Sequence, residues 1–248
     1  MLGFDPLDKM SFQDAFMFAA EKELVLEIQL EPPLFWFSDE QVHHLKKLRS
    51  EYSDTPLMIH APYRDVLLGS LYEPIRVAGI ELVKRSIDLA AELDAILVVF
   101  HAGEINNKTP RDLALERAKD SIDRIVNYAE DRGIPIALEN APFWKQALFL
   151  YASDFLSLEG VPICLDIPHA YAVDALDAFL DLLGERITAY HLSDTVRGRD
   201  LHAPLGEGEI PWKSVLSRMD KSKPWILEVG DRESVERSLE ALAILGYT

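Results

Sequence analysis

Hydrophobic residues are grouped along this chain in short runs that alternate with longer segments of helical periodicity. The short runs predict eight β-strands, at residues 1–5, 24–30, 56–62, 95–103, 134–140, 161–167, 187–194 and 224–230. Several runs are almost continuously apolar instead of alternating with polar residues, which is typical of parallel strands covered on both faces. The pattern therefore predicts a parallel sheet with helices packed against it.

The segments between the strands indicate helices. Residues 38–52 begin with Ser-Asp-Glu, which is a good N-terminal cap followed by acidic residues. Residues 81–93, 111–131 and 232–245 repeat apolar residues at helical spacing, and the second of these segments stops before Gly133, a residue type that commonly ends helices. Helices are thus expected to connect successive strands.

Alternating strands and helices in 248 residues fit the size of a (β/α)₈ TIM barrel. A doubly wound sheet is the alternative, but it usually carries a glycine-rich loop after its first strand. Residues 4–10, FDPLDKM, contain no glycine, and no segment has the composition of a linker. We therefore predict an α/β protein with a single TIM-barrel domain covering residues 1–248.

Ionisable residues recur where the predicted strands end. Five of the seven histidines are placed in this way, together with several acidic residues. In a TIM barrel the carboxyl ends of all strands meet at one face, where active sites lie. Histidine, aspartate and glutamate are the usual ligands of zinc and related divalent ions. The sequence thus predicts a metal site, with more than one ion, among His60, His101, Glu139, Asp166, His169, His191, Asp200, His202 and Glu228.

The acidic residues strengthen this interpretation. Glu139, Asp166 and Glu228 each close an apolar strand, and no lysine or arginine alternates with them inside those strands. Buried carboxylates are costly unless they are paired, protonated or bound to a metal. Any single histidine is more often a structural residue than a ligand, so the prediction depends on the whole set. His43 and His44 lie within a predicted helix and are interpreted as surface or packing residues.

Composition narrows the classes of partner. The formal net charge of −17 repels nucleic acid at long range, so a nucleic-acid partner would need a local basic or metal-lined cleft. The acidic balance is equally explained as a means of keeping the protein soluble. Cys164 is the single cysteine and is interpreted as a buried hydrophobic residue. No apolar run approaches the ~20 residues that span a bilayer, so we expect a soluble cytoplasmic protein without a membrane partner.

Three further segments bear on substrate binding. Two of them allow two interpretations each, and the third is expected to be a turn. Arg197 and Arg199 could bind a phosphate or sugar oxygen or simply be solvated. The aromatic segment 32–37 could form the wall of a pocket or cap the barrel. Residues 205–210, LGEGEI, contain no basic residue and are expected to form a turn leading to Trp212 rather than a phosphate cradle.

The order of short motifs is similar to that of a known family. HAPY, FHAG, LEN, LDxxHA, HLSD, DLHxxLGEGEI and LEV follow one another from residue 60 to residue 229. In this respect the chain resembles the xylose-isomerase-like TIM barrel superfamily, which includes endonuclease IV and many sugar isomerases and epimerases. The resemblance runs over nearly the whole chain from the third predicted strand onward.

The endonuclease IV pattern implies three zinc ions. By this resemblance, the first would be held by His60, His101 and Glu139, and the second by Asp166, His191 and Glu228, with Glu139 bridging the two. The third would be held by His169, Asp200 and His202. The implied reaction is hydrolysis of a phosphoester or phosphodiester, in which the ions activate a water and stabilise the leaving oxygen. The substrate would be a small phosphoester or abasic DNA.

The sugar isomerase branch implies a different use of the same barrel. One manganese or magnesium ion would be held by Glu139, Asp166, His191 and Glu228. Glu139 and Glu228 would then move a proton beside a carbonyl, while His169 and Arg197 or Arg199 orient the oxygens of a sugar. His60, His101, Asp200 and His202 have no required role in that branch, and their presence favours the multinuclear hydrolase. A metal-binding barrel without catalysis is the third possibility.

The parts of endonuclease IV that contact DNA are less well matched. The first strand region reads GFDP where those enzymes typically have a histidine, and residues 30–37 replace their arginine-containing loop. Tyr63 is retained after HAP as a candidate substrate-binding residue, but the sequence that follows it is RDVLLGS. We therefore predict an endonuclease-IV-like metal centre with reduced means of gripping a base-flipped duplex.

Overall fold

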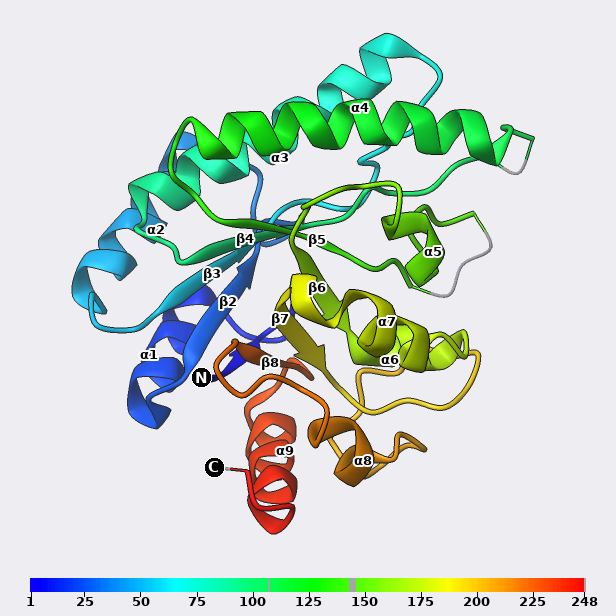
Figure 1. Cartoon of the computed structure of the whole chain (residues 1–248). Coiled ribbons are helices and arrows are strands. Elements are labelled where there is room, and N and C mark those ends of the chain that lie inside the picture. The colour runs from blue at the N-terminus through cyan, green and yellow to red at the C-terminus, as the bar shows by residue number, and fades with distance from the viewer. Residues whose placement is uncertain (107, 143–145, 248) are drawn as a thin grey trace.

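The computed structural model describes residues 1–106, 108–142 and 146–247, and its strands form a closed parallel barrel (Figure 1). Each strand pairs with its neighbours in chain order, and the last strand pairs with the first. The strands are β1 (Leu2–Asp5), β2 (Val25–Gln29), β3 (Leu57–His60), β4 (Leu97–Phe100), β5 (Ile136–Glu139), β6 (Ile163–Asp166), β7 (Ile187–Leu192) and β8 (Trp225–Glu228). The predicted TIM barrel is confirmed.

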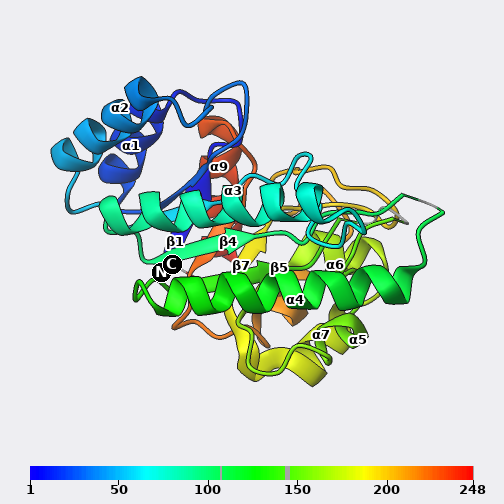
Figure 2. The same cartoon turned by 90° about the horizontal axis from the view of Figure 1, so that it is seen from above.

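Helices cover the outside of the barrel (Figures 1 and 2). They are α1 (Phe12–Lys22), α2 (Asp39–Glu51), α3 (Glu73–Glu92), α4 (Arg111–Glu130), α5 (Ala152–Phe155), α6 (Ile167–Ala172), α7 (Leu176–Leu183), the 3₁₀ helix η1 (Gly184–Arg186), α8 (Trp212–Leu216) and α9 (Arg232–Ile244). Ser38 begins α2 as predicted, because its side chain accepts a hydrogen bond from the Gln41 backbone N–H. Within the described residues, no helix is long and apolar enough to cross a membrane.

The interior of the barrel is built in layers because alternate residues of each strand point inward. The lower layer is apolar and buried: Val25, Met58, Leu97, Val99, Ala137, Cys164, Ala189 and Ile226. Gly3 completes it, since a Cβ atom there would lie 2.6 Å from the Ile226 side chain. Cys164 is therefore a buried packing residue, as predicted.

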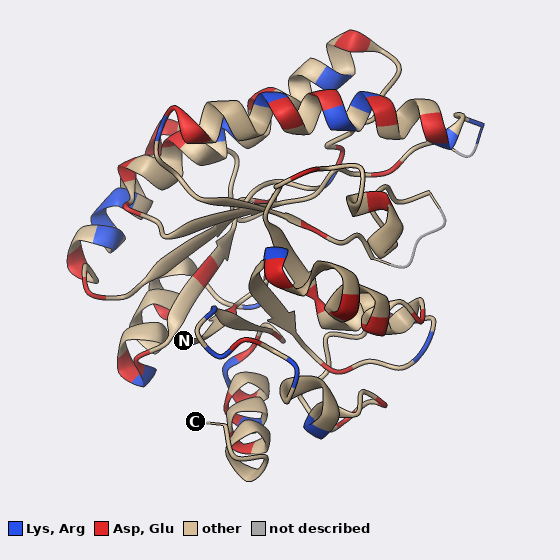
Figure 3. Cartoon of the chain, viewed as in Figure 1, with Lys and Arg blue, Asp and Glu red and all other residues tan. Residues whose placement is uncertain are grey.

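The next inward layer, two residues further along each strand, is ionisable. Every strand contributes one member, at or just after its end except for Glu27, which lies within β2: Asp5, Glu27, His60, His101, Glu139, Asp166, His191 and Glu228. All eight are buried. Charged residues of both signs lie on the outer helices instead, for example along α2, α3 and α4 (Figure 3). The fold therefore concentrates buried acids and imidazoles at the carboxyl end of the barrel.

Candidate metal centre at the carboxyl ends of the strands

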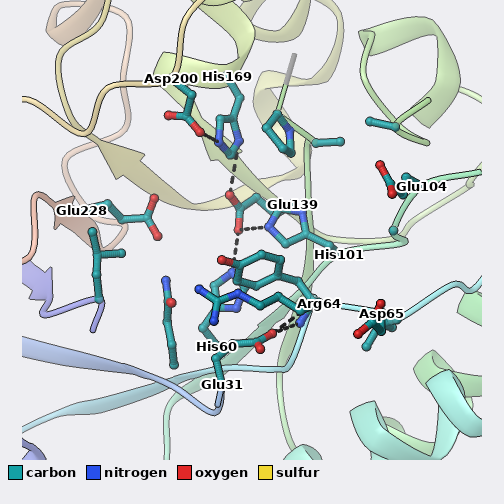
Figure 4. A pocket seen from close by; sticks show the side chains of 18 of the residues that line it. Glu31, His60, Arg64, Asp65, His101, Glu104, Glu139, His169, Asp200 and Glu228 are labelled. Carbon is teal, nitrogen blue, oxygen red and sulfur yellow. Dashed lines mark hydrogen bonds and ion pairs between the residues drawn. The ribbon is translucent and has the colours of Figure 1, made fainter. Parts of the chain in front are cut away.

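Glu139, the last residue of β5, lies at the centre of a cluster of imidazole rings (Figure 4). Its Oε2 atom is 3.0 Å from His60 Nε2 and 3.3 Å from His101 Nε2. Its Oε1 atom is 3.4 Å from His191 Nδ1 and 3.6 Å from His169 Nδ1. Because the side chain is only 1% exposed, its two oxygens face two different sets of nitrogen atoms inside the protein.

Two compact sets of ligand atoms share this carboxylate. One atom from each of His60, His101 and Glu139 lies within 4.8 Å of the others. The same holds for Glu139, Asp166, His191 and Glu228, in which His191 Nδ1 is 3.3 Å from Glu228 Oε1. The structure thus brings together two of the ligand groups that the family resemblance implied, with Glu139 common to both.

The third implied group is adjacent but more open. Asp200 lies between two histidines, with Oδ2 3.4 Å from His169 Nε2 and Oδ1 3.4 Å from His202 Nε2. Its side chain is 18% exposed and that of His202 is 30% exposed. In the described part of the chain, these three residues do not form a group whose ligand atoms all lie within 4.8 Å. They are placed together, but less tightly than the first two groups.

The buried atoms of this cluster fit a divalent ion. Asp166 Oδ2, His191 Nδ1 and Asp200 Oδ1 are buried and make no hydrogen bond to the described residues. A buried polar atom without a partner is costly, and a bound cation would provide one. Neutral imidazole nitrogens with carboxylate oxygens are a donor set that suits zinc, and also manganese or iron. The residues present are therefore compatible with the metal that the sequence predicted.

Burial and neighbouring charges shift the pKa values of this cluster in both directions. Burial raises the pKa of Asp166 to about 6 and that of Glu228 to about 7. Burial alone would lower the pKa of His60. The hydrogen bond to Glu139 and the negative charge of that carboxylate outweigh burial and raise the pKa of His60 to about 9. Burial lowers the pKa of His101 to about 3. Metal ligands must be deprotonated, so binding an ion here would release protons.

Comparison with known proteins agrees with this geometry. Residues 22–245 match the family described as xylose isomerase-like TIM barrel. The chain belongs to this family. The family match begins ahead of β2, earlier in the chain than the motifs alone indicated.

Relatives within the family carry different activities in their names. The chain is 27% identical over 229 residues to a probable endonuclease 4 of Mycobacterium tuberculosis, covering 86% of this chain and 87% of that protein. It superposes on a D-tagatose 3-epimerase-like protein with a TM-score of 0.86 and 26% identity, covering 98% and 96% of the two chains. Endonuclease IV from Thermus thermophilus gives 0.73 and 25%, covering 98% of each. The family is shown, whereas the choice between hydrolase and epimerase is open.

Two buried acids of the ionisable layer were not predicted as site residues. Asp5 ends β1, and Glu27 lies within β2. Burial raises the pKa of Asp5 well above its ordinary value, and the nearby Glu228 and Glu27 carboxylates add to the effect. Glu27 Oε2 lies 3.0 Å from His191 Nε2. The available signal was the same one that revealed Glu139, because Glu27 also interrupts an apolar strand.

A cavity of about 520 Å³ opens beside this cluster of imidazoles and carboxylates. Tyr63 lines it, with its ring centre 5.9 Å from that of His60 and 5.8 Å from that of His101. Pro32 and Leu34 also line it, whereas Phe35 is buried in the core. Segment 32–37 therefore contributes to the wall of this pocket, which was one of its two interpretations.

The arginine that faces this cavity differs from the two that the sequence suggested. Arg64 is among the described residues that line it, and Arg197 and Arg199 are not. Arg197 instead pairs with Asp174 at 2.5 Å and stacks over the Tyr171 ring. The prediction of Arg197 and Arg199 as substrate-binding residues is not supported by this arrangement, because the loop after β7 directs Arg197 outward, where its side chain is 55% exposed.

The LGEGEI segment has a structural role, as its composition suggested. Asp194, just after β7, is buried and accepts hydrogen bonds from Gly206 N at 2.7 Å and Trp212 Nε1 at 2.9 Å. A Cβ atom on Gly208 would lie 2.3 Å from Asp194 Oδ1, so only glycine fits there. This turn fixes the loop that carries Asp200 and His202. His43 and His44 are exposed on α2, as predicted.

Proposed function

We propose that this protein is a metal-dependent hydrolase that cleaves a phosphoester bond at a multinuclear, zinc-type centre. The observation that carries the proposal is the division of Glu139 between two groups. Its Oε2 atom faces His60 and His101, and its Oε1 atom faces His191 and His169. A site for one ion would need neither His60 nor His101, yet both are buried and directed at this carboxylate.

The proposed ligand sets follow the geometry. His60, His101 and Glu139 would hold one ion, and Glu139, Asp166, His191 and Glu228 a second. His169, Asp200 and His202 would hold a third in the more open group. Ions held there would supply an activated water and neutralise charge on phosphate oxygens. Tyr63 would form the wall of the substrate site beside His60 and His101, and the Arg64 guanidinium would place a positive charge at the cavity wall.

A small phosphoester suits the cavity better than duplex DNA does. The volume of about 520 Å³ is typical of a site for a small molecule. Its lining includes the acidic residues Glu31, Asp65 and Glu104, and the whole chain carries a formal charge of −17. Both would repel the closely spaced phosphates of a duplex. We therefore propose a pocket-sized phosphoester as the substrate and abasic DNA as the less favoured one.

Isomerisation or epimerisation of a sugar at one manganese or magnesium ion is the second candidate. Glu139 and Glu228 both belong to the group that contains Asp166 and His191, so they could remove and return a proton on a sugar carbon. The similarity to a D-tagatose 3-epimerase-like protein also favours it. His60 and His101 have no part in that chemistry, which is why we place it second.

Metal content and product analysis together separate the two candidates. We expect the purified protein to contain two or three zinc equivalents and to hydrolyse a chromogenic phosphodiester such as bis(p-nitrophenyl) phosphate. A duplex with one abasic site and a panel of ketohexoses serve as alternative substrates in parallel assays. One manganese or magnesium equivalent together with epimerised ketohexose would establish the second candidate and refute the first.

A further inference from the structure

Glu27 is a buried carboxylate whose hydrogen-bond partner comes from a strand that is not its neighbour. Its Oε2 atom accepts a hydrogen bond from His191 Nε2 at 3.0 Å, and both side chains are completely buried. Glu27 lies in β2 and His191 in β7, so the contact passes through the barrel interior. Glu27 belongs to none of the ligand groups found among the described residues.

Three other histidines of the cluster are held in the opposite sense. His60, His169 and His202 each donate a hydrogen bond from Nδ1 to a backbone carbonyl, of Ala61, Asn140 and Glu228 respectively. Their Nε2 atoms are then directed at carboxylates of the cluster. In His191 the nitrogen that meets the cluster is Nδ1, 3.4 Å from Glu139 Oε1 and 3.3 Å from Glu228 Oε1.

We propose that Glu27 is a positioning residue that holds the His191 ring with Nδ1 toward Glu139 and Glu228. A carboxylate oxygen accepts hydrogen bonds, so the contact with Glu27 Oε2 places a hydrogen on His191 Nε2. In the metal-bound protein, Nδ1 is then the nitrogen left free to donate a lone pair. Partners of this kind fix the orientation of a ligating histidine and raise its basicity. This role rests on the metal centre proposed above.

Because the His191 ring has the inverted orientation, Glu27 has a role that a backbone carbonyl does not fill here. A backbone carbonyl orients His60, His169 and His202 whatever side chains surround it, whereas His191 depends on a side chain supplied by another strand. Loss of the Glu27 carboxylate would leave the buried Nε2–H without a partner. The ring could then rotate, because exchanging its two nitrogens would pair Nε2–H with Glu139 or Glu228 instead.

Three variants separate orientation from charge. Glu27→Leu removes the acceptor, and Glu27→Gln keeps an acceptor oxygen but removes the charge. Asp5→Asn replaces a buried carboxyl of the same layer with an amide of the same shape and removes no hydrogen bond to His191. Zinc affinity is measured for each by competition with a chelator. Nitrogen-15 NMR of labelled histidine reports, in metal-free and zinc-loaded protein, which ring nitrogen of His191 carries a slowly exchanging proton.

We expect Glu27→Leu to weaken binding of one zinc equivalent about 10- to 100-fold and, in the zinc-loaded protein, to remove the Nε2 proton signal of His191. Glu27→Gln and Asp5→Asn should keep the signal and lose less than about tenfold in affinity. Wild-type affinity in Glu27→Leu, or equal losses in Glu27→Leu and Glu27→Gln, would overturn the positioning role. Normal zinc binding without phosphoester hydrolysis would overturn the proposed reaction and leave this role intact. If Glu27→Leu does not fold, Glu27→Gln and Asp5→Asn provide the test. Equal losses of zinc affinity in these two variants, together with loss of the His191 Nε2 proton signal in Glu27→Gln, would overturn the positioning role.

Discussion

Single side chains at this site are oriented by contacts outside the ligand groups. Glu139 is shared between two sets of nitrogens, and each set is held by residues from several strands. The most informative residue for the number of ions is His101, because its Nε2 atom faces only the Oε2 side of Glu139. It has no role in a site for one ion.

We expect His101→Ala to remove one zinc equivalent and to reduce phosphoester hydrolysis more than about 100-fold, since a direct ligand matters at least as much as its supporting partners. Metal analysis and initial rates on bis(p-nitrophenyl) phosphate measure the two effects. His43→Ala, on the exposed face of α2, is the matched control and should change neither. Full hydrolysis by His101→Ala would refute the multinuclear centre.

A second residue-scale prediction concerns the two kinds of arginine. Arg64 lines the cavity, whereas Arg197 is paired with Asp174 at the surface. A hydrogen bond to a charged group contributes about 1.5–3 kcal/mol, so Arg64→Ala should raise KM for an anionic phosphoester about tenfold or more. Arg197→Ala should leave KM within about twofold. Steady-state kinetics of both variants measure these changes in KM. A larger rise in KM for Arg197→Ala than for Arg64→Ala would show that the loop after β7 binds the substrate.

The nine predicted ligands could be found from sequence because each is an ionisable residue at the end of an apolar run or shortly after it. Asp5 and Glu27 carry the same signal in weaker form. Asp5 precedes a proline and is easily interpreted as part of a turn, and Glu27 is followed by another polar strand residue, Gln29. Their importance depends on contacts across the barrel, such as Glu27 with His191, which are fixed only when the barrel closes.

At the scale of elements, strand order and the positions of four helices, α2, α3, α4 and α9, followed from the hydrophobic pattern, whereas element boundaries did not. The predicted helix 81–93 is the second half of α3, which begins at Glu73. Pro74 and Gly79 obscured the first half. Pro74 occupies the first turn, where its missing N–H costs nothing. Gly79 packs closely on the Leu68 side chain, 3.3 Å from where its Cβ would be.

The loop between β7 and α8 provides the element-scale prediction. Asp194 accepts hydrogen bonds from Thr195 N, Gly206 N and Trp212 Nε1. Asp194→Ala would leave these donors unpaired in a buried place, at about 1–3 kcal/mol for each. We expect a loss of roughly 3–5 kcal/mol in the free energy of unfolding, measured by urea denaturation. Asp231→Ala, which removes the N-cap of α9 and an exposed ion pair with Lys9, should cost about 1 kcal/mol. Similar losses in both variants would contradict the proposed role of Asp194.

At the scale of the whole molecule, the proposed metal centre draws residues from most of the barrel. Ligands from β3 to β8, from α6 and from the loop after β7 would be tied together by bound ions. An ion that binds only the folded protein at 100 times its Kd adds about 2.7 kcal/mol. Removal of metal with a chelator should therefore lower Tm by about 5–10 °C, and added zinc should restore it. An unchanged Tm would show that bound ions do not stabilise the folded barrel.

The pH dependence of metal binding follows from the protons held in the metal-free cluster. Glu228 has a pKa of about 7, Asp166 of about 6 and His60 of about 9, so all three carry protons at pH 5.5. An ion must displace them, and each proton released makes affinity rise about tenfold per pH unit below the pKa of that group. Zinc affinity should therefore increase at least tenfold between pH 5.5 and 7.5, measured by competition with a chelator whose own protonation is corrected. Equal affinity across this range would mean that the ions bind elsewhere, because exposed carboxylates with ordinary pKa values are already ionised at pH 5.5.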